Sequence, residues 1–208
     1  MTTGENIFTI SAEGAWTGHS ACADRQFDAL CECESVTVQK PAALPPTSGV
    51  ADVRDVMRSI VTGVCLATTY RETPEGLEHD AQTVNSLTEV SMSPPLVSIC
   101  LPRDSPFLQD LRSSLSWGIS ILDVCGDDIA VQFAQDRPAR ASALAGLGLT
   151  PAPRTGALVM PGRSWLECEL FRCVDAGDHT VVIGEVLSAQ LAVGRPPLIY
   201  LDGQFRVA

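Results

Sequence analysis

The chain has 208 residues, 45% of them hydrophobic and 19% charged, which indicates a globular protein with a sizeable core. Its formal net charge of -11, with no cluster of basic residues, argues against nucleic acid and anionic membranes as partners. No apolar stretch approaches the roughly 20 residues of a membrane span, and no secretory signal is recognisable, so we expect a cytoplasmic protein.

Residues 1–48 lack sustained periodicity and end in a proline-rich linker. We therefore expect a poorly ordered N-terminal extension before a single domain at residues 49–208. The extension carries four potential zinc ligands, His19, Cys22, Cys31 and Cys33. Their spacing fits no common zinc motif, so we expect no metal site, with zinc binding as the alternative.

Five further cysteines lie in apolar or strand-like runs of the expected domain. They are Cys65, Cys100, Cys125, Cys168 and Cys173. In a reducing compartment such cysteines are small buried side chains. A disulfide framework is the weaker interpretation, because this is not a short secreted chain.

The first half of the expected domain alternates helix and strand signals. Asp52 begins a predicted helix whose apolar positions repeat at helical spacing, and Gly63 is its expected C-cap. A strand is predicted over residues 64–70, followed by a polar hairpin turn at residues 71–79. The pair Ser105-Pro106 is typical of the N-cap and first turn of a second helix.

The second half is dominated by strand signals. After a predicted strand at residues 117–122 and a short helix, the Ala-, Gly- and Pro-rich residues 137–162 are expected to be mostly loop. Three more strands are predicted at residues 164–171, 180–187 and 197–201. Six or seven strands with few helices indicate a small closed or partly closed barrel.

The segment from Thr83 to Leu96 concentrates small hydroxyl and amide side chains. The Asn85 amide and nearby backbone groups suit a planar ligand rich in heteroatoms. Hydroxyls and backbone N–H groups also suit a phosphate tail. The hydroxyl candidates are Ser86, Thr88, Ser91 and Ser93. From these residues alone, a turn-rich strand edge whose side chains bind local backbone is the alternative.

Three regions resemble the short-chain flavin reductases in order, spacing and combination. The first runs from Thr62 to Leu96, the second from Gly156 to Val186 and the third from Pro197 to Gly203. The second includes the motif Trp165-Leu166-Glu167-Cys168 and the turn Gly177-Asp178-His179. This combination is specific, although each piece alone would be weak. The resemblance implies a mainly β fold: a Greek-key, FMN-binding split β-barrel with a few peripheral helices.

The resemblance also implies an NAD(P)H-dependent flavin reductase. Such an enzyme uses NADH or NADPH to reduce FMN or FAD, and the reduced flavin diffuses to a separate flavin-dependent monooxygenase. A homodimer that forms over strands beside the pocket, with both subunits near each flavin, is implied too. The alternative is a repurposed split-barrel protein that carries flavin or performs a non-redox step in a biosynthetic pathway.

Individual roles follow from the same resemblance. The residues implied to bind flavin are Thr83, Val84, Asn85, Ser86, Thr88, Ser91, Ser93, Asp178 and Tyr200. His179 is implied as the catalytic residue, facing the nicotinamide side of the flavin. Its task would be positioning, because hydride moves directly between the two rings. From the sequence alone, a solvated turn histidine is the alternative, with Asp178 setting its tautomer or capping the turn.

Several residues depart from the family pattern. Strict strand alternation would put Glu89 on the face of Ser91, where its charge would repel a phosphate unless a bulge or loop turns it away. Leu201 and Asp202 replace a usual histidine and basic residue, and Arg140 lacks the phenylalanine that usually follows. No Gly-x-Ser-x-Gly elbow and no Gly-x-Gly-x-x-Gly motif occur, which argues against a hydrolase and a Rossmann site.

Overall fold

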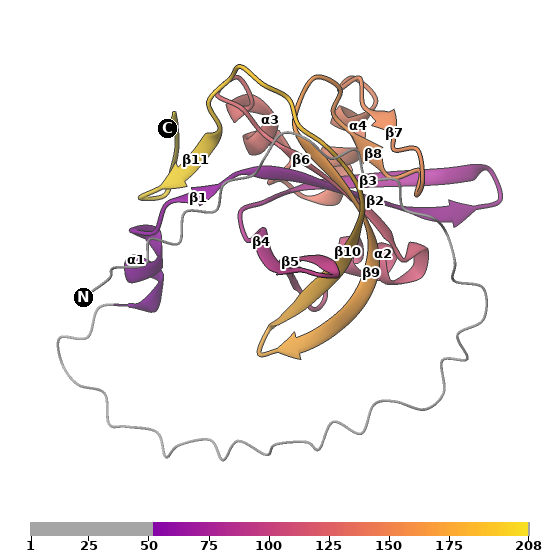
Figure 1. Ribbon diagram of the computed structural model, residues 1–208, viewed down its shortest axis with the longest axis horizontal. Helices are drawn as coiled ribbons and strands as arrows, with labels where there is room; N and C mark the ends of the chain where they lie inside the picture. The colour runs from indigo at the N-terminus through magenta and orange to yellow at the C-terminus, as the bar shows by residue number, and fades with distance from the viewer. Residues whose placement is uncertain (1–51, 208) are drawn as a thin grey trace, which may run out of the picture. The chain divides into compact units, whose positions relative to one another are not determined.

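The computed structural model describes residues 52–207 (Figure 1). The helices are α1 Val53–Arg58, α2 Pro106–Ser114, α3 Asp127–Gln132 and α4 Arg137–Leu144. The strands are β1 Thr62–Gly63, β2 Cys65–Thr73, β3 Gly76–Val84, β4 Thr88–Met92, β5 Pro95–Pro102, β6 Ser116–Ile121, β7 Thr150–Pro151, β8 Leu158–Val159, β9 Trp165–Ala176, β10 His179–Gln190, β11 Leu198–Leu201 and β12 Gln204–Val207.

An antiparallel sheet of seven strands, in the order β3-β2-β6-β9-β10-β5-β4, is the centre of the fold. A smaller sheet joins β1, β11 and β12. The long β9–β10 hairpin reaches away from α3 and α4 in Figure 1. This architecture confirms the mainly β prediction. The strands β9 and β10 are longer than predicted, because they continue to a tight turn in which Gly177 has a φ of 64°.

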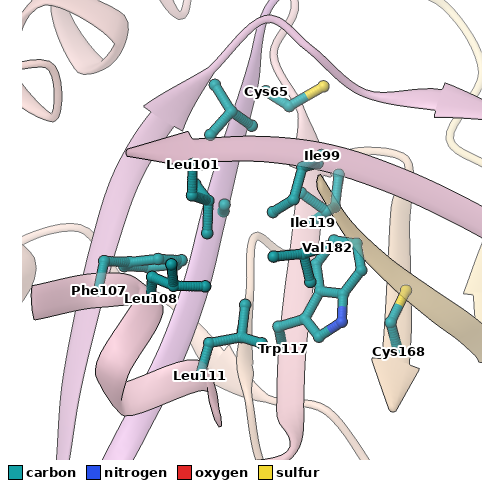
Figure 2. Packing of buried hydrophobic residues seen from close by; sticks show 12 residues of the cluster. Cys65, Ile99, Leu101, Phe107, Leu108, Leu111, Trp117, Ile119, Cys168 and Val182 are labelled. Atoms are coloured by element: carbon teal, nitrogen blue, oxygen red, sulfur yellow. The ribbon is translucent and has the colours of Figure 1, made fainter. Parts of the chain in front are cut away.

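The main core lies between the large sheet and α2 (Figure 2). The helix α2 begins at Pro106 as predicted, and its Phe107, Leu108 and Leu111 are fully buried. They pack in one cluster with inward side chains of β5, β6 and β10. Burying each large apolar side chain contributes about 1.5–3 kcal/mol, so this cluster holds the strands in their register.

Two glycines allow strands to approach bulky neighbours. At Gly184 in β10, a β-carbon would stand 2.5 Å from the Trp117 ring. At Gly118 in β6, it would stand 2.7 Å from the carbonyl oxygen of Leu158. Both positions therefore require a residue without a side chain. Gly184 belongs to one of the segments that carry the family resemblance, and its role there is packing.

The helix α1 begins as predicted but ends differently. Asp52 is its N-cap, because its carboxylate accepts a hydrogen bond from the backbone N–H of Arg54 at 3.0 Å. The C-cap is Ser59, so the prediction of Gly63 as the cap is wrong. Gly63 instead belongs to β1, because the chain pairs with β11 soon after the helix.

The predicted loop at residues 137–162 is wrong in its first part, which forms α4. Asp136 caps this helix by accepting a backbone N–H bond, and Pro138 occupies its first turn. Arg140 then bonds Asp80 of β3. This tertiary contact anchors an alanine-rich segment whose own apolar pattern is weak.

Four charged side chains join β3, α2 and α4. Arg140 Nη2 lies 2.9 Å from Asp80 Oδ2, and Arg140 Nε donates to Asp80 Oδ1 at 3.3 Å. Arg137 contacts Asp110 and lies 3.5 Å from Asp80. Two cations face two carboxylates, so the network is neutral, and buried charges are tolerated only when they are paired in this way.

The cysteine prediction is confirmed for Cys65 and Cys168, which are buried, and all five described cysteines are free thiols. Burial raises the pKa of Cys65 to about 12 and also raises the pKa of Cys168, so both remain protonated. The prediction is wrong for Cys100 and Cys125, which are exposed. Cys100 is exposed because its neighbours in β5 face the core, and successive strand residues face opposite sides.

Two predictions fall on residues 1–48, outside the described part of the chain: the poorly ordered extension and the alternative of zinc binding there. Within residues 52–207, no group of His, Cys, Asp and Glu side chains is arranged to hold a metal ion. Among the helices of the same residues, none has the length and apolar character needed to cross a membrane.

Candidate functional site

A cavity of about 510 Å³ opens at the end of β3. The ends of β3, β5 and α3, the start of α2 and one residue of α4 meet around it. Its volume falls within the range of small-molecule and cofactor sites. Four residues that the sequence singled out line it together: Thr83, Val84, Asn85 and Ser86.

Thr83 and Val84, at the end of β3, are held in place by α3 on one side and by β2 on the other. The Thr83 backbone N–H donates to the Phe133 carbonyl at 3.0 Å, and its hydroxyl donates to the Ala130 carbonyl at 2.8 Å. Both donors of Thr83 therefore hold α3 against β3, and its hydroxyl oxygen retains only acceptor capacity. Val84 is buried and pairs with Cys65 of β2.

Asn85 and Ser86 follow β3 and behave differently. Asn85 is exposed in the cavity, and its amide makes no hydrogen bond within residues 52–207. That amide can offer both donors and an acceptor to a ligand. The Ser86 hydroxyl instead accepts the backbone N–H of Cys100 at 2.9 Å, which ties this loop to β5. The exposed Cys100 lines the cavity beside it.

Arg140 brings a positive charge to the lining, but the charge is matched. Its side chain donates to both oxygens of Asp80 and to the Gln135 carbonyl at 2.9 Å. Three hydrogen bonds fix the guanidinium in place, and the Asp80 carboxylate neutralises it. Asp104, also in the lining, adds a negative charge. The cavity therefore has no strong positive potential for a phosphate.

His179 lies beside the cavity. It pairs across the sheet with Pro102, which lines the cavity, so their Cα atoms are about 4.5–5.5 Å apart. The half-exposed His179 ring has Nδ1 at 2.8 Å from the Asp178 carboxylate. This hydrogen bond lowers the pKa of Asp178, which keeps the carboxylate ionised beside the ring. Asp178 itself is exposed, and its carbonyl accepts the Arg103 N–H at 3.0 Å.

The hydroxyls of β4 do not line this cavity. Thr88 and Ser91 lie in β4 and Ser93 lies in the turn after it, and Ser91 pairs with Leu96 of β5. From Leu96 to Cys100 the strand advances by four residues, about 13 Å. A role for these three hydroxyls in flavin binding therefore stays a prediction.

Tyr200 and its neighbours belong to the small sheet. Tyr200 pairs with Thr62 and packs on Phe205, with ring centroids 5.4 Å apart. It does not line the cavity, so its flavin-binding role also stays a prediction. Leu201 and Asp202, which depart from the family pattern, lie at the end of β11 and in the turn after it. Neither lines the cavity.

Glu89 is exposed and is not part of the cavity lining. A β-bulge explains why strict alternation fails here. Glu89 pairs with Val97 and Ser91 pairs with Leu96, so Val90 is an extra residue in β4. The extra residue interrupts the alternation of faces, and Glu89 need not share the face of Ser91.

Sequence reasoning missed residues that reach the cavity from distant elements. Gln82, Asp104 and Phe133 line it from β3, from the segment before α2 and from the end of α3. In the sequence, the only notable feature of Arg140 is that the phenylalanine that usually follows this arginine in the family is missing. The Ser105-Pro106 signal placed the start of α2 correctly and was the one clue that could have added Asp104.

The residues present fit a flavin. The open Asn85 amide and the exposed backbone at the end of β3 suit the ring edge, which alternates donors and acceptors. Pro102 and Pro106, which are both exposed in the lining, supply apolar surface for a planar ring. The paired Arg140 gives only weak electrostatic attraction for a phosphate, which is the arrangement expected for a ligand that binds and leaves.

Comparisons with known proteins identify the family of this chain. Residues 57–208 match the family model described as flavin reductase like domain. The chain is 31% identical to the NADH-dependent FAD reductase of Streptomyces globisporus, over 83% of this chain and 93% of that protein. It is 32% identical to the actinorhodin polyketide dimerase of Streptomyces coelicolor, over 74% of this chain and 83% of that protein.

A solved structure shows the same fold. The flavin reductase component of a bacterial two-component tryptophan halogenase superposes with a TM-score of 0.67 at 34% identity, covering 74% of this chain and 94% of that chain. The fold is that of the split-barrel flavin reductases. The chain belongs to the flavin reductase-like family.

Proposed function

We propose that this chain transfers hydride from NADH to FAD and releases the reduced flavin to a separate flavin-dependent monooxygenase. The observation that carries the proposal is the cavity at the end of β3, where the Asn85 amide is open to a ligand within a flavin reductase fold. The choice of NADH and FAD rests on the relative named NADH-dependent FAD reductase.

The bound flavin supplies the ring that accepts the hydride, and the residues of the chain bind and orient the reactants. Asn85 would hydrogen-bond the ring edge, while Pro102 and Pro106, both exposed in the lining, would contact the ring face. His179, held by Asp178, orients the nicotinamide at the rim of the cavity and transfers no proton. The neutral Arg140–Asp80 pair favours release, because it leaves no uncompensated cation to retain a phosphate.

We expect His179→Ala to lower kcat/KM for NADH by about tenfold to a hundredfold, with FAD affinity nearly unchanged. Loss of the imidazole affects the orientation of the nicotinamide, whereas the residues at the end of β3 that bind the flavin are unchanged. The measurement is NADH oxidation by the purified protein with added FAD or FMN. His79→Gln is the matched control, because His79 packs on Tyr70 in the β2–β3 hairpin and does not line the cavity.

Absence of NADH or NADPH oxidation with any flavin would contradict the reductase function. A flavin titration would then separate a flavin carrier from a reassigned cavity. The second possibility has a specific basis, because one relative of similar identity is named a polyketide dimerase. Equal activity of His179→Ala and the wild type would be consistent with the reductase function but would contradict the proposed role of His179.

We also propose that two copies associate through α1. No α1 residue is buried, and its apolar side chains are exposed, as are those of the two apolar residues just after it. These are Val53, Val56, Met57, Ile60 and Val61, each 47% to 72% exposed. Exposed apolar surface of this kind marks an interface in soluble proteins. The family resemblance implies a homodimer over strands beside the pocket, and α1 would extend that interface.

We expect the full-length chain to have twice its monomer mass of 22.1 kDa by light scattering after size exclusion. The double variant Val56→Ser, Met57→Ser should shift it toward the monomer, because it removes apolar area from α1. An exposed apolar residue of another element, Leu191→Ser, is the control. A monomeric wild type would contradict the proposal. The cytoplasmic location expected from the sequence stays a prediction.

A further inference from the structure

The tip of the β9–β10 hairpin carries His179 but has little core packing of its own. Of residues 174–180, only Thr180 is buried. Segments with few buried contacts open locally with small changes in free energy. A residue that orients a nicotinamide must nevertheless keep its position, because a misplacement of about 1 Å can lower the rate by a large factor. The tip therefore needs contacts from outside the hairpin.

Arg103 supplies such contacts from the segment between β5 and α2. Its backbone N–H donates to the Asp178 carbonyl at 3.0 Å. Its side chain donates to the Gly177 carbonyl at 3.4 Å and lies 3.3 Å from the Asp175 carboxylate. A single arginine thus contacts three residues of the tip, two of them through its side chain.

The same arginine is part of the segment that forms one side of the flavin cavity. Its two neighbours in the chain, Pro102 and Asp104, both line the cavity. Pro102 also pairs across the sheet with His179. Arg103 therefore links the lining of the cavity directly to the turn that precedes His179.

Asp175 is the acceptor on which these contacts converge. Its carboxylate accepts the Thr180 hydroxyl at 2.7 Å and an Arg112 N–H of α2 at 3.2 Å, in addition to its ion pair with Arg103. The Thr180 hydroxyl and the two arginines lower the pKa of Asp175, so the carboxylate stays ionised. Thr180 follows His179 in β10 and is fully buried, so fixing Thr180 also fixes the backbone from which the His179 ring projects to the opposite side.

We propose that Arg103 and Asp175 are positioning residues that hold His179 beside the flavin cavity. The inference rests on the proposed function, in which His179 orients the nicotinamide. Neither Arg103 nor Asp175 is part of the cavity lining, so they act through His179 and not on the reacting rings. Their loss should therefore affect the reaction with NADH and leave flavin binding unchanged.

The first arm of the test measures the tip itself, in the full-length protein without ligands. Amide hydrogen exchange over residues 175–180, followed by mass spectrometry, should be severalfold faster in Arg103→Ala and in Asp175→Asn than in the wild type. Both side chains are about half exposed, at 55% and 46%, so both variants should fold. Arg71→Ala is the matched control, because it removes an exposed ion pair with Glu78 from the β2–β3 hairpin. It should leave exchange at the β9–β10 tip unchanged.

The second arm measures NADH oxidation with FAD. We expect Arg103→Ala to lower kcat/KM for NADH by about threefold to tenfold, with the KM for FAD unchanged. Arg103→Lys should recover part of the loss, because it keeps a cation facing Asp175. In a His179→Ala background, Arg103→Ala should have no further effect, since residues that act through one group are not additive.

Unchanged exchange in both variants would overturn the proposal. A loss of activity that adds fully to that of His179→Ala would overturn it as well, because Arg103 would then act independently of the histidine. If the wild type oxidises neither NADH nor NADPH with any flavin, the proposed function fails. The exchange arm would still decide whether Arg103 and Asp175 hold the tip.

Discussion

Replacing Asp80 with alanine should lower the free energy of unfolding by about 3–5 kcal/mol, because it leaves a buried cation without its partner. Asp80 is 2% exposed and Arg140 is 8% exposed, so water cannot take over the role of the carboxylate. Arg137 loses the second of its two carboxylates as well. A loss of this size is a large part of the stability of an ordinary domain.

Urea denaturation of the wild type and the variant measures this loss. Glu78→Ala is the matched control, since Glu78 lies in the same strand and pairs with Arg71 at 2.7 Å on the surface. Exposed ion pairs of this kind contribute little to stability, because water screens them. The double variant Asp80→Leu, Arg140→Met should recover much of the stability, because it removes the charge and the partner together. If Asp80→Ala lowers the free energy of unfolding no more than Glu78→Ala does, the buried charge network does not stabilise the fold as we expect.

Gly184→Ala should cost about 1–3 kcal/mol by overpacking the core. The added β-carbon would stand 2.5 Å from the ring of Trp117, which is fully buried and belongs to the main cluster shown in Figure 2. The ring cannot move aside without displacing the side chains that surround it. The strand β10 would have to shift instead, and its register with β9 already changes between Ile183 and Gly184.

Gly63→Ala is the control for Gly184→Ala. Gly63 also lies in a strand, but a β-carbon there would meet no atom within 4 Å. The two variants therefore make the same chemical change in a filled and in an open environment. We expect urea midpoints that fall for Gly184→Ala and stay near the wild type for Gly63→Ala. Equal midpoints would show that the sheet absorbs the methyl group at no cost.

The elements that could be predicted from the sequence are those whose signal is local. The alternation at residues 164–171 and the Ser105-Pro106 pair depend on neighbours in the chain, and both predictions are confirmed. The helix α4 depends instead on Arg140 reaching Asp80, 60 residues away. Its local signals, Asp136 and Pro138, were present but are weak beside an Ala- and Gly-rich composition.

The residues of the candidate site also divide into those with a local signal in the sequence and those placed by long-range contacts. Thr83 to Ser86 are contiguous, so one motif places all four around the cavity. Phe133 and Arg140 reach it only because α3 and α4 fold back onto β3, and no local pattern encodes that contact. Cys100 was misjudged because an apolar run does not reveal which of its alternating faces is covered.

The bulge at Val90 determines which kinds of change this hairpin can tolerate over evolution. Because Glu89 is exposed and away from the cavity, its identity and charge can vary at little cost. Loss of the extra residue is different, because a shift of one position moves every side chain of a strand to its other face. Chain length, more than residue type, is therefore what selection must preserve between β3 and β5.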